Sequence, residues 1–293
     1  MSRDTSSGRA TVRQLCAVFR VSRQAYYEAR RSSERGPTKP RRERRGPWVS
    51  DAELIAGIKA IVAENPAWGT RKVWASLRRG GVTASQRRVW KRMQALGLVL
   101  PGPGHVGAQE TYGHVSVADS NRRWGTDLTT VYTKHDGFVA LVPVVDFGDR
   151  SALACRVTKS QMSGPVIAAT EKALLDQFGD AAAVPDGLEW RTDHGPQFTG
   201  SDSDAFVDLW GLQHTFSPVG RPTGNAITER FILTLKIELL WTRDWASIDE
   251  VQQAVDKWLV LYNEQRPHQA LSWRTPAEQR ALNLNTQPRR MAA

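Results

Sequence analysis

The chain has 293 residues, of which 40% are hydrophobic, and a formal net charge of +10 at pH 7. This length fits two or three domains of roughly 100–200 residues each. There is no run of about 18 apolar residues, which argues against a membrane span, and the two cysteines, Cys16 and Cys155, are too few for a disulfide framework. Because the amino terminus also lacks the apolar centre of a signal peptide, we expect a reduced, cytoplasmic protein.

The positive charge is concentrated at the amino-terminal end of the chain. Residues 1–100 contain 22 Lys and Arg but only 7 Asp and Glu, so the rest of the chain is net negative. Such asymmetry favours a nucleic-acid-binding arm attached to a second function. A solvated basic surface gives the same composition, so charge alone does not establish DNA binding.

Residues 11–31 predict a short helix-turn-helix unit. Leu15, Val18 and Phe19 form an apolar stripe at helical spacing, and Ser22 is a suitable N-cap for a second helix. An ordinary helical hairpin fits this pattern equally well.

Arg23 and Gln24, near the start of that second helix, are the predicted DNA contacts of this unit. Residues 32–50 are rich in Arg, Pro, Gly and Ser and include the basic run Arg41–Arg45. This composition predicts a flexible linker that contacts DNA phosphates. Residues 1–50 are therefore the first predicted domain.

Residues 51–100 predict a three-helix DNA-binding domain of the helix-turn-helix type. Leu54 and Ile58 repeat at helical spacing, and Ser85 is a suitable cap for a third helix with a basic face. A basic face opposite an apolar stripe suits contact with phosphates, although many surface helices share it. The predicted DNA contacts are Arg71, Lys72, Arg87, Arg88, Lys91 and Arg92. Residues 101–122 are expected to be a connector.

From Arg123 onward the pattern changes to strands that alternate with helices. Three initial strands, the first two joined by a turn at residues 135–137, are followed by alternating elements, which predicts a mixed sheet with helices on its faces. The predicted class is α/β, with a core at 123–240 that resembles the ribonuclease-H-like fold and a helical segment at 241–293. Strands are predicted near 124–133, 138–146, 152–158, 188–192 and 212–216, and helices near 163–178, near 202–210 and from near Gly224.

Three carboxylates in this core, Asp127, Asp193 and Glu229, are candidate ligands for divalent cations. Asp127 lies in the first predicted strand, where a carboxylate among apolar neighbours needs a partner or a metal. Asp193 follows a strand, and ligands of α/β sheets commonly bind there; Glu229 lies on a helix. Two Mg²⁺ ions need such acidic oxygens to converge. Asp146 and Asp149 are rival ligands, but their positions at a strand end and in a turn explain them without a metal.

Asn225, Glu229 and Lys236 share one face of the predicted helix. Asn225 is expected to orient Glu229 or to hydrogen-bond to DNA, and Lys236 is expected to contact a phosphate. His194, next to Asp193, is expected to form a hydrogen bond or to contact DNA. In a chain with 30 acidic residues, the spacing of three of them is by itself weak evidence.

The motifs around these residues resemble the insertion-sequence-three family of transposases, in particular its larger reading-frame product with a retroviral-integrase-type catalytic core. The resemblance covers nearly the whole chain. One departure is Ile227-Thr228, where the family usually has small or apolar residues. The matching motifs are Trp124-Gly125-Thr126-Asp127-Leu128-Thr129, Thr192-Asp193-His194-Gly195-Pro196-Gln197-Phe198, Gly224-Asn225-Ala226, Glu229-Arg230-Phe231, Thr234-Leu235-Lys236, Tyr262-Asn263, Arg266-Pro267-His268, Thr275-Pro276 and, upstream, Pro66, Trp68-Gly69-Thr70-Arg71 and Gly97-Leu98.

The resemblance implies a DNA transposase, a polynucleotidyl transferase in which Asp127, Asp193 and Glu229 hold two Mg²⁺ or Mn²⁺ ions. It implies cleavage at the terminal inverted repeats of an insertion element and transfer of the 3′-OH to target DNA. Two element ends imply a homodimer or larger assembly on double-stranded DNA, associated with the nucleoid. The family usually acts with a partner protein from an upstream reading frame, and no membrane partner is implied.

Two other functions remain open at this point. A DNA-binding regulator with a catalytically silent core would explain the basic arm, but the intact carboxylates argue against it. A ribonuclease-H-type nuclease would explain the carboxylates, but it leaves the two helix-turn-helix units without a role.

Overall fold

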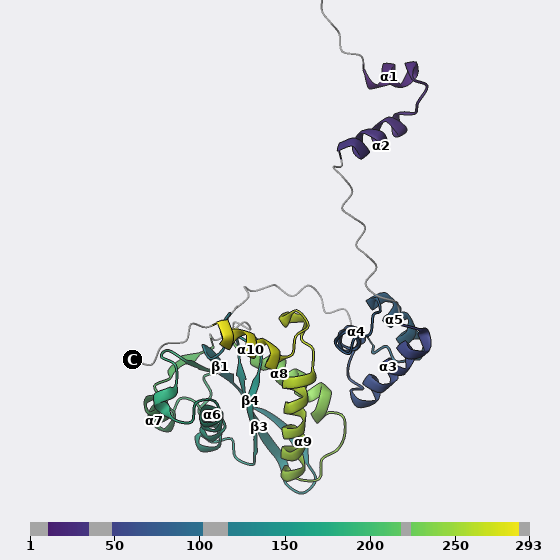
Figure 1. Cartoon of the computed structure of the whole chain (residues 1–293). Coiled ribbons are helices and arrows are strands. Elements are labelled where there is room, and N and C mark those ends of the chain that lie inside the picture. The colour runs from purple at the N-terminus through teal and green to yellow at the C-terminus, as the bar shows by residue number, and fades with distance from the viewer. Residues whose placement is uncertain (1–10, 35–48, 102–116, 218–223, 287–293) are drawn as a thin grey trace, which may run out of the picture. The chain divides into compact units, whose positions relative to one another are not determined.

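The computed structural model of the chain describes residues 11–34, 49–101, 117–217 and 224–286 (Figure 1). The chain divides into two compact units, Met1–Trp48 and Val49–Ala293. The predicted basic run Arg41–Arg45 and most of the predicted connector lie outside the described residues. Within the described ranges, no helix combines the length and the apolar character needed to cross a bilayer.

The first unit contains two helices, α1 (Val12–Val18) and α2 (Arg23–Glu34). Ser22 Oγ accepts a hydrogen bond from the backbone N–H three residues later, which confirms the predicted N-cap. The predicted apolar stripe is not a buried face, because Val18 and Phe19 are 76% and 70% exposed. Two short helices are too few to bury all of their apolar side chains.

The second unit begins with a three-helix domain, as predicted. Its helices are α3 (Asp51–Glu64), α4 (Thr70–Arg79) and α5 (Gln86–Ala95). Ser85 caps α5 by accepting a hydrogen bond from the backbone N–H of Arg88, which confirms the predicted cap. The core of this domain consists of fully or nearly fully buried side chains: Leu54, Ile58, Trp68, Val73, Leu77, Val89 and Met93.

A six-stranded mixed sheet follows, which confirms the predicted fold class. Strand β3 pairs antiparallel with β1, β2 and β4, whereas β5 pairs parallel with β1 on one side and with β6 on the other. The strand predicted near 124–133 is in fact two strands, and the chain leaves the sheet at Asp127 and Leu128 between them. The strands are β1 (Arg123–Thr126), β2 (Thr129–Thr133), β3 (Gly137–Asp146), β4 (Ala152–Thr158), β5 (Glu189–Thr192) and β6 (Gln213–Phe216).

Helices cover both faces of this sheet (Figure 1). Successive side chains of a strand point to opposite faces. Leu141 and Val145 of β3 therefore pack with α8 (Ala226–Leu235) and α9 (Ile248–Val260), whereas Val142 and Val144 pack with α6 (Ser163–Phe178) and α7 (Ser201–Trp210). The helical elements are α6 (Ser163–Phe178), the 3₁₀ turn η1 (Ala181–Ala183), α7 (Ser201–Trp210), α8 (Ala226–Leu235), the π-helical turn η2 (Lys236–Leu240), α9 (Ile248–Val260), the π-helical turn η3 (Leu261–Gln265), the 3₁₀ turn η4 (Gln269–Leu271) and α10 (Pro276–Thr286).

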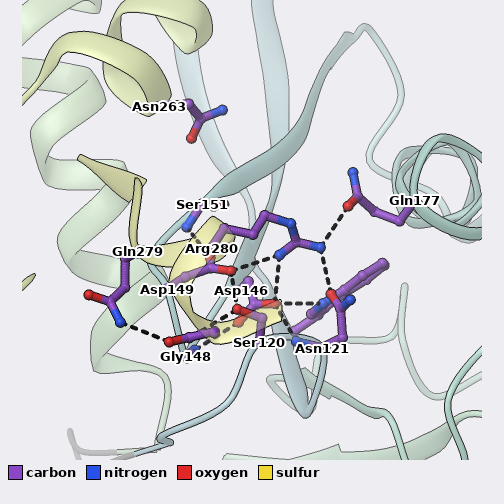
Figure 2. Close-up of polar contacts among 12 residues, drawn as sticks. Ser120, Asn121, Asp146, Gly148, Asp149, Ser151, Gln177, Asn263, Gln279 and Arg280 are labelled. Atoms are coloured by element: carbon purple, nitrogen blue, oxygen red, sulfur yellow. Dashed lines mark hydrogen bonds and ion pairs between the residues drawn. The ribbon is translucent and has the colours of Figure 1, made fainter. Parts of the chain in front are cut away.

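A buried polar cluster ties α10 to the sheet (Figure 2). Arg280 of α10 donates to Asp149 Oδ2 at 2.8 Å and to Asp146 Oδ2 at 3.2 Å, and its other terminal nitrogen donates to Asn121 and Gln177. Burial, and then the charge of Asp149, raises the pKa of Asp146 to about 6. Both carboxylates are therefore held by partners within the fold, in line with their interpretation as strand-end and turn residues.

Candidate active site

Asp127 and Asp193 occupy equivalent positions on two neighbouring parallel strands. Strands β1 and β5 pair with Trp124 opposite Trp190 and Gly125 opposite Arg191, and each strand ends one residue before its aspartate. Because parallel strands end at the same edge of a sheet, the two carboxylates leave the sheet side by side. This edge is where ligands bind in open α/β sheets.

Helix α8 brings Glu229 to the same edge by packing closely on β1. A Cβ atom added to Gly125 would overlap the hydroxyl of Thr228 and the ring of Phe147, so only glycine allows the helix to lie this near. Thr228 is fully buried at that contact. Thr228, which belongs to the departure from the family pattern, is therefore the residue that contacts β1, and it immediately precedes Glu229.

Two side chains fasten the start of α8 to the ends of the strands. Asn225, the N-cap residue of α8, donates from Nδ2 to the backbone oxygen of Thr126 at 3.4 Å. Arg191 of β5 donates from Nε to the backbone oxygen of Gly224 at 2.9 Å. Asn225 is only 4% exposed, which favours its predicted positioning role over its predicted contact with DNA.

Asp193, Glu229 and Lys236 all act electrostatically on Asp127. Burial raises the pKa of Asp127 to about 6; the backbone N–H of Leu128 opposes this shift, and the negative charges of Asp193 and Glu229 add to it. The nearby positive charge of Lys236 lowers the same pKa. Repulsion among carboxylates that share a site is what a bound cation relieves.

The donor set suits a hard divalent cation. Asp127 and Asp193 each use Oδ1 to accept one backbone N–H, from Leu128 and from Gly195, both at 2.8 Å. No ion pair within the described ranges involves either aspartate or Glu229. Carboxylate oxygens free of cationic partners are the ligands that Mg²⁺ prefers.

The carboxylates do not form a ready-made metal cage. Among the described residues, no three His, Cys, Asp or Glu side chains lie close enough together to hold a metal ion. Glu229 is exposed, whereas Asp127 and Asp193 are half-buried. The residues fit Mg²⁺ by their chemistry and by their common edge, and Glu229 is the one with the most freedom to adjust.

The residues predicted to contact DNA divide into two groups in the helix-turn-helix domain. Arg87 and Lys91 of α5 are exposed and stay predicted contacts. Arg88 and Arg92, one turn apart, both pair with Asp51 at the start of α3. Their guanidinium groups hold α5 against α3, so these groups are less available to bind a DNA phosphate than the sequence pattern predicts.

Lys72 and Arg71 lie at the start of α4, on the side toward the core. Lys72 pairs with Glu238 at 2.5 Å, so the structure places it in an internal ion pair. Arg71 donates to Gln269 at 3.4 Å. In the first unit, Arg23 and Gln24 are exposed on α2 and remain predicted contacts. The side chain of the exposed His194 stacks on Phe216, with ring centroids 4.9 Å apart.

Glu238 and Arg266 form a buried ion pair that the sequence pattern does not predict. Glu238 lies in η2, two residues after Lys236, and accepts hydrogen bonds from Arg266, Lys72 and Trp68. Its side chain is 4% exposed and that of Arg266 is 8% exposed. Arg266 belongs to a quoted motif, but nothing in the spacing of these residues predicts that they meet.

Known families match three stretches of the chain. Residues 49–104 match the family described as HTH-like domain. Residues 118–222 and residues 210–276 each match a family described as Integrase core domain. These matches confirm the predicted helix-turn-helix domain and the predicted integrase-type core.

Curated relatives give the same assignment over most of the chain. Transposase InsD for insertion element IS2A/D/F/H/I/K of Escherichia coli is 29% identical over 258 residues, which cover 82% of this chain and 83% of that protein. Transposase InsD for insertion element IS2-9 of Escherichia coli strain K12 is also 29% identical over 258 residues, covering 82% of this chain and 81% of its own length.

Two viral structures are also similar. The chain of a simian T-cell lymphotropic virus intasome in complex with PP2A regulatory subunit B56 gamma has a TM-score of 0.49 at 19% identity, covering 76% of this chain and 75% of that chain. The HTLV-2 integrase catalytic core domain in complex with magnesium (trimeric form) has a TM-score of 0.42 at 20% identity, covering 56% of this chain and 98% of that chain. With its HTH-like domain, its integrase core and these relatives, the chain is a homologue of the InsD transposases, which supports the predicted resemblance to insertion-sequence-three transposases.

Proposed function

We propose that this transposase cleaves the ends of an insertion element and transfers the resulting 3′-OH to target DNA, with Asp127, Asp193 and Glu229 binding two Mg²⁺ or Mn²⁺ ions. The observation that carries the proposal is the placement of the two aspartates directly after adjacent parallel strands. The Coulombic effect of Asp193 and Glu229 on the pKa of Asp127 supports it.

The divalent cations, when bound, supply activation of the attacking hydroxyl and stabilisation of the leaving oxygen. The protein supplies rigid supports for the carboxylates, because β1 and β5 are paired to each other within the sheet. Asn225 holds the start of α8 on β1, which fixes the helix that carries Glu229. Lys236 provides positive charge beside the carboxylates, where the scissile phosphate would lie.

The DNA substrate is double-stranded, and its terminal inverted repeats are read by the helix-turn-helix units. The proposed contacts in the second of these units are Arg87 and Lys91 of α5, and their exposure supports this role. Because an element has two ends, the active form is a homodimer or larger assembly on DNA, and an upstream-frame protein is a further partner. The protein acts at the nucleoid in the cytoplasm.

The test is strand cleavage and joining of labelled element-end DNA in the presence of Mg²⁺. We expect Asp193→Asn to abolish both reactions while DNA binding persists. Asp208→Asn is the matched control, because Asp208 is exposed on α7. Cleavage by the Asp193 variant at the wild-type rate would overturn the site, and binding without cleavage by the wild-type protein in Mg²⁺ and in Mn²⁺ would favour a regulator with a silent core.

A further inference from the structure

A cavity of about 830 Å³ lies between the helix-turn-helix domain and the core, and the proposed catalytic site does not use it. One wall is the amino-terminal turn of α4, from Gly69 to Lys72. The lining also includes one face of α8, with Ala226 and Arg230, together with part of the segment that follows α9. The helix that carries Glu229 therefore also lines this cavity.

The lining is cationic. It contains five Lys and Arg side chains and no Asp or Glu. Lys72 and Arg266 are paired with Glu238 behind the wall, but the guanidinium groups of Arg150 and Arg230 form no ion pair or hydrogen bond with any residue in the described ranges. Burial lowers the pKa of Arg150, and the nearby negative charges of Asp146 and Asp149 only partly offset this effect. The amino terminus of a ten-residue helix adds to the positive potential.

Part of the remaining lining is aromatic. Phe147, Tyr262 and Trp273 all border the cavity; Phe147 and Tyr262 are buried, whereas Trp273 is half-buried and is the ring of these three that a base can reach. His268 does not add charge, because burial, and then the positive charge of Arg266, lowers its pKa to about 2. Cations that can hold a phosphate, beside aromatic rings on which a base can stack, are the combination by which proteins hold a nucleic-acid strand.

We propose that this cavity binds one nucleotide unit of the DNA strand, with its phosphate at Arg150, Arg230 and the amino terminus of α4 and its base against Trp273. The proposal rests on the proposed function in taking DNA as the ligand. It adds a strand-binding site that joins the helix-turn-helix domain to the catalytic helix. A free nucleotide presents the same phosphate chemistry as a DNA strand. The experiment therefore distinguishes binding of a DNA strand from binding of a free nucleotide.

The test is fluorescence anisotropy of a labelled single-stranded oligodeoxynucleotide with the full-length chain at several salt concentrations. We expect Arg150→Gln and Arg230→Gln each to weaken binding and to reduce the slope of log K against log salt concentration by about one, the value for one lost phosphate contact. Arg156→Gln is the matched control, because Arg156 is exposed on β4 and lies outside the cavity. Arg150→Lys keeps the charge and should restore the slope.

Unchanged affinity and slope in both glutamine variants would overturn the proposal. Arg230 is exposed, so its variant remains informative if Arg150→Gln fails to fold by circular dichroism. A deoxynucleoside monophosphate and inorganic phosphate are titrated in parallel: if they bind at Arg150 while oligonucleotide binding does not depend on it, the site takes free nucleotide and the assignment to DNA is wrong. Asp193→Asn should bind the oligonucleotide as the wild-type protein does. A failure of the catalytic proposal would appear in a different measurement, as DNA cleavage by the Asp193→Asn variant.

Discussion

The ammonium group of Lys72 lies 2.5 Å from Glu238 Oε1, which joins the helix-turn-helix domain to the helical segment that carries Glu229. Arg266 pairs with the same carboxylate at 2.8 Å. A second link, Arg79 with Glu278, uses two hydrogen bonds between α4 and α10. The DNA-binding domain is thus linked to the catalytic core through charged groups, of which Glu238 and Arg266 have buried side chains.

Glu238→Gln should lower the free energy of unfolding by about 3 kcal/mol, because removing one member of a buried ion pair leaves the partner charge uncompensated. Arg266 is the partner whose charge is left most deeply buried without compensation, since its side chain is 8% exposed. Urea unfolding of the two proteins measures the difference. Glu264→Gln is the control, because Glu264 is exposed in the neighbouring turn η3; an equal effect of both substitutions would refute the role of the buried pair.

The effect of Glu238→Gln should also depend on pH. Burial raises the pKa of Glu238, but hydrogen bonds and charge from Arg266, together with Lys72, outweigh burial and hold the pKa below its ordinary value of 4.5. A carboxyl whose pKa is lowered in the folded state stabilises the protein above its unfolded pKa and loses that contribution as pH falls. The gap in unfolding free energy between wild type and variant should therefore be full at neutral pH and shrink below pH about 4. A gap that stays constant with pH would contradict this account.

Gly125→Ala should damage both stability and cleavage. The new methyl group overlaps Thr228 and Phe147, and forcing an extra carbon into a packed core costs about 1–3 kcal/mol. Because the clash pushes α8 away from β1, Glu229 moves with it, and we expect the Mg²⁺-dependent cleavage rate to fall further than the stability loss explains. Gly164→Ala is the control, since a Cβ there meets nothing within 4 Å. Wild-type cleavage by Gly125→Ala would show that this close contact does not position Glu229.

Arg280→Gln should release α10 from the sheet. The substitution leaves Asp146 and Asp149, both fully buried, without their cation, which costs about 3–5 kcal/mol. Hydrogen exchange should show faster exchange in α10 as well as a lower global stability, whereas Arg274→Gln, at an exposed position, should change neither. If exchange in α10 is unaffected, the cluster in Figure 2 is not what holds this helix.

The sequence predicted the elements of the core well, because apolar alternation, helix caps and turn residues are local signals. The helix expected near 163–178 matches α6, and the strand expected near 152–158 matches β4. The break at Asp127 was missed, since the apolar pattern continues across it and only the pairing of β1 with both β3 and β5 shows where the strand ends.

The three carboxylates were recognised through their motifs, but the partners of the basic residues were not. The charges of Lys72 and Arg92 alone suggested DNA contacts. Each residue has an acidic partner that is remote in the sequence: Lys72 pairs with Glu238, and Arg92 pairs with Asp51. Such pairs depend on tertiary packing, for which a helical pattern holds no information. The exposure of Val18 has the same origin, because a stripe at helical spacing does not say what will cover it.

The proposed catalytic site requires that Asp127, Asp193 and Glu229 bind divalent cations together. Electron paramagnetic resonance of Mn²⁺ titrated into the full-length chain measures this without DNA. Wild type and Asp208→Asn should bind Mn²⁺ alike, whereas Asp127→Asn, Asp193→Asn and Glu229→Gln should each lose tight binding. If any one of these three variants binds Mn²⁺ as tightly as the wild-type protein does, that residue is not a metal ligand and the proposed site is wrong.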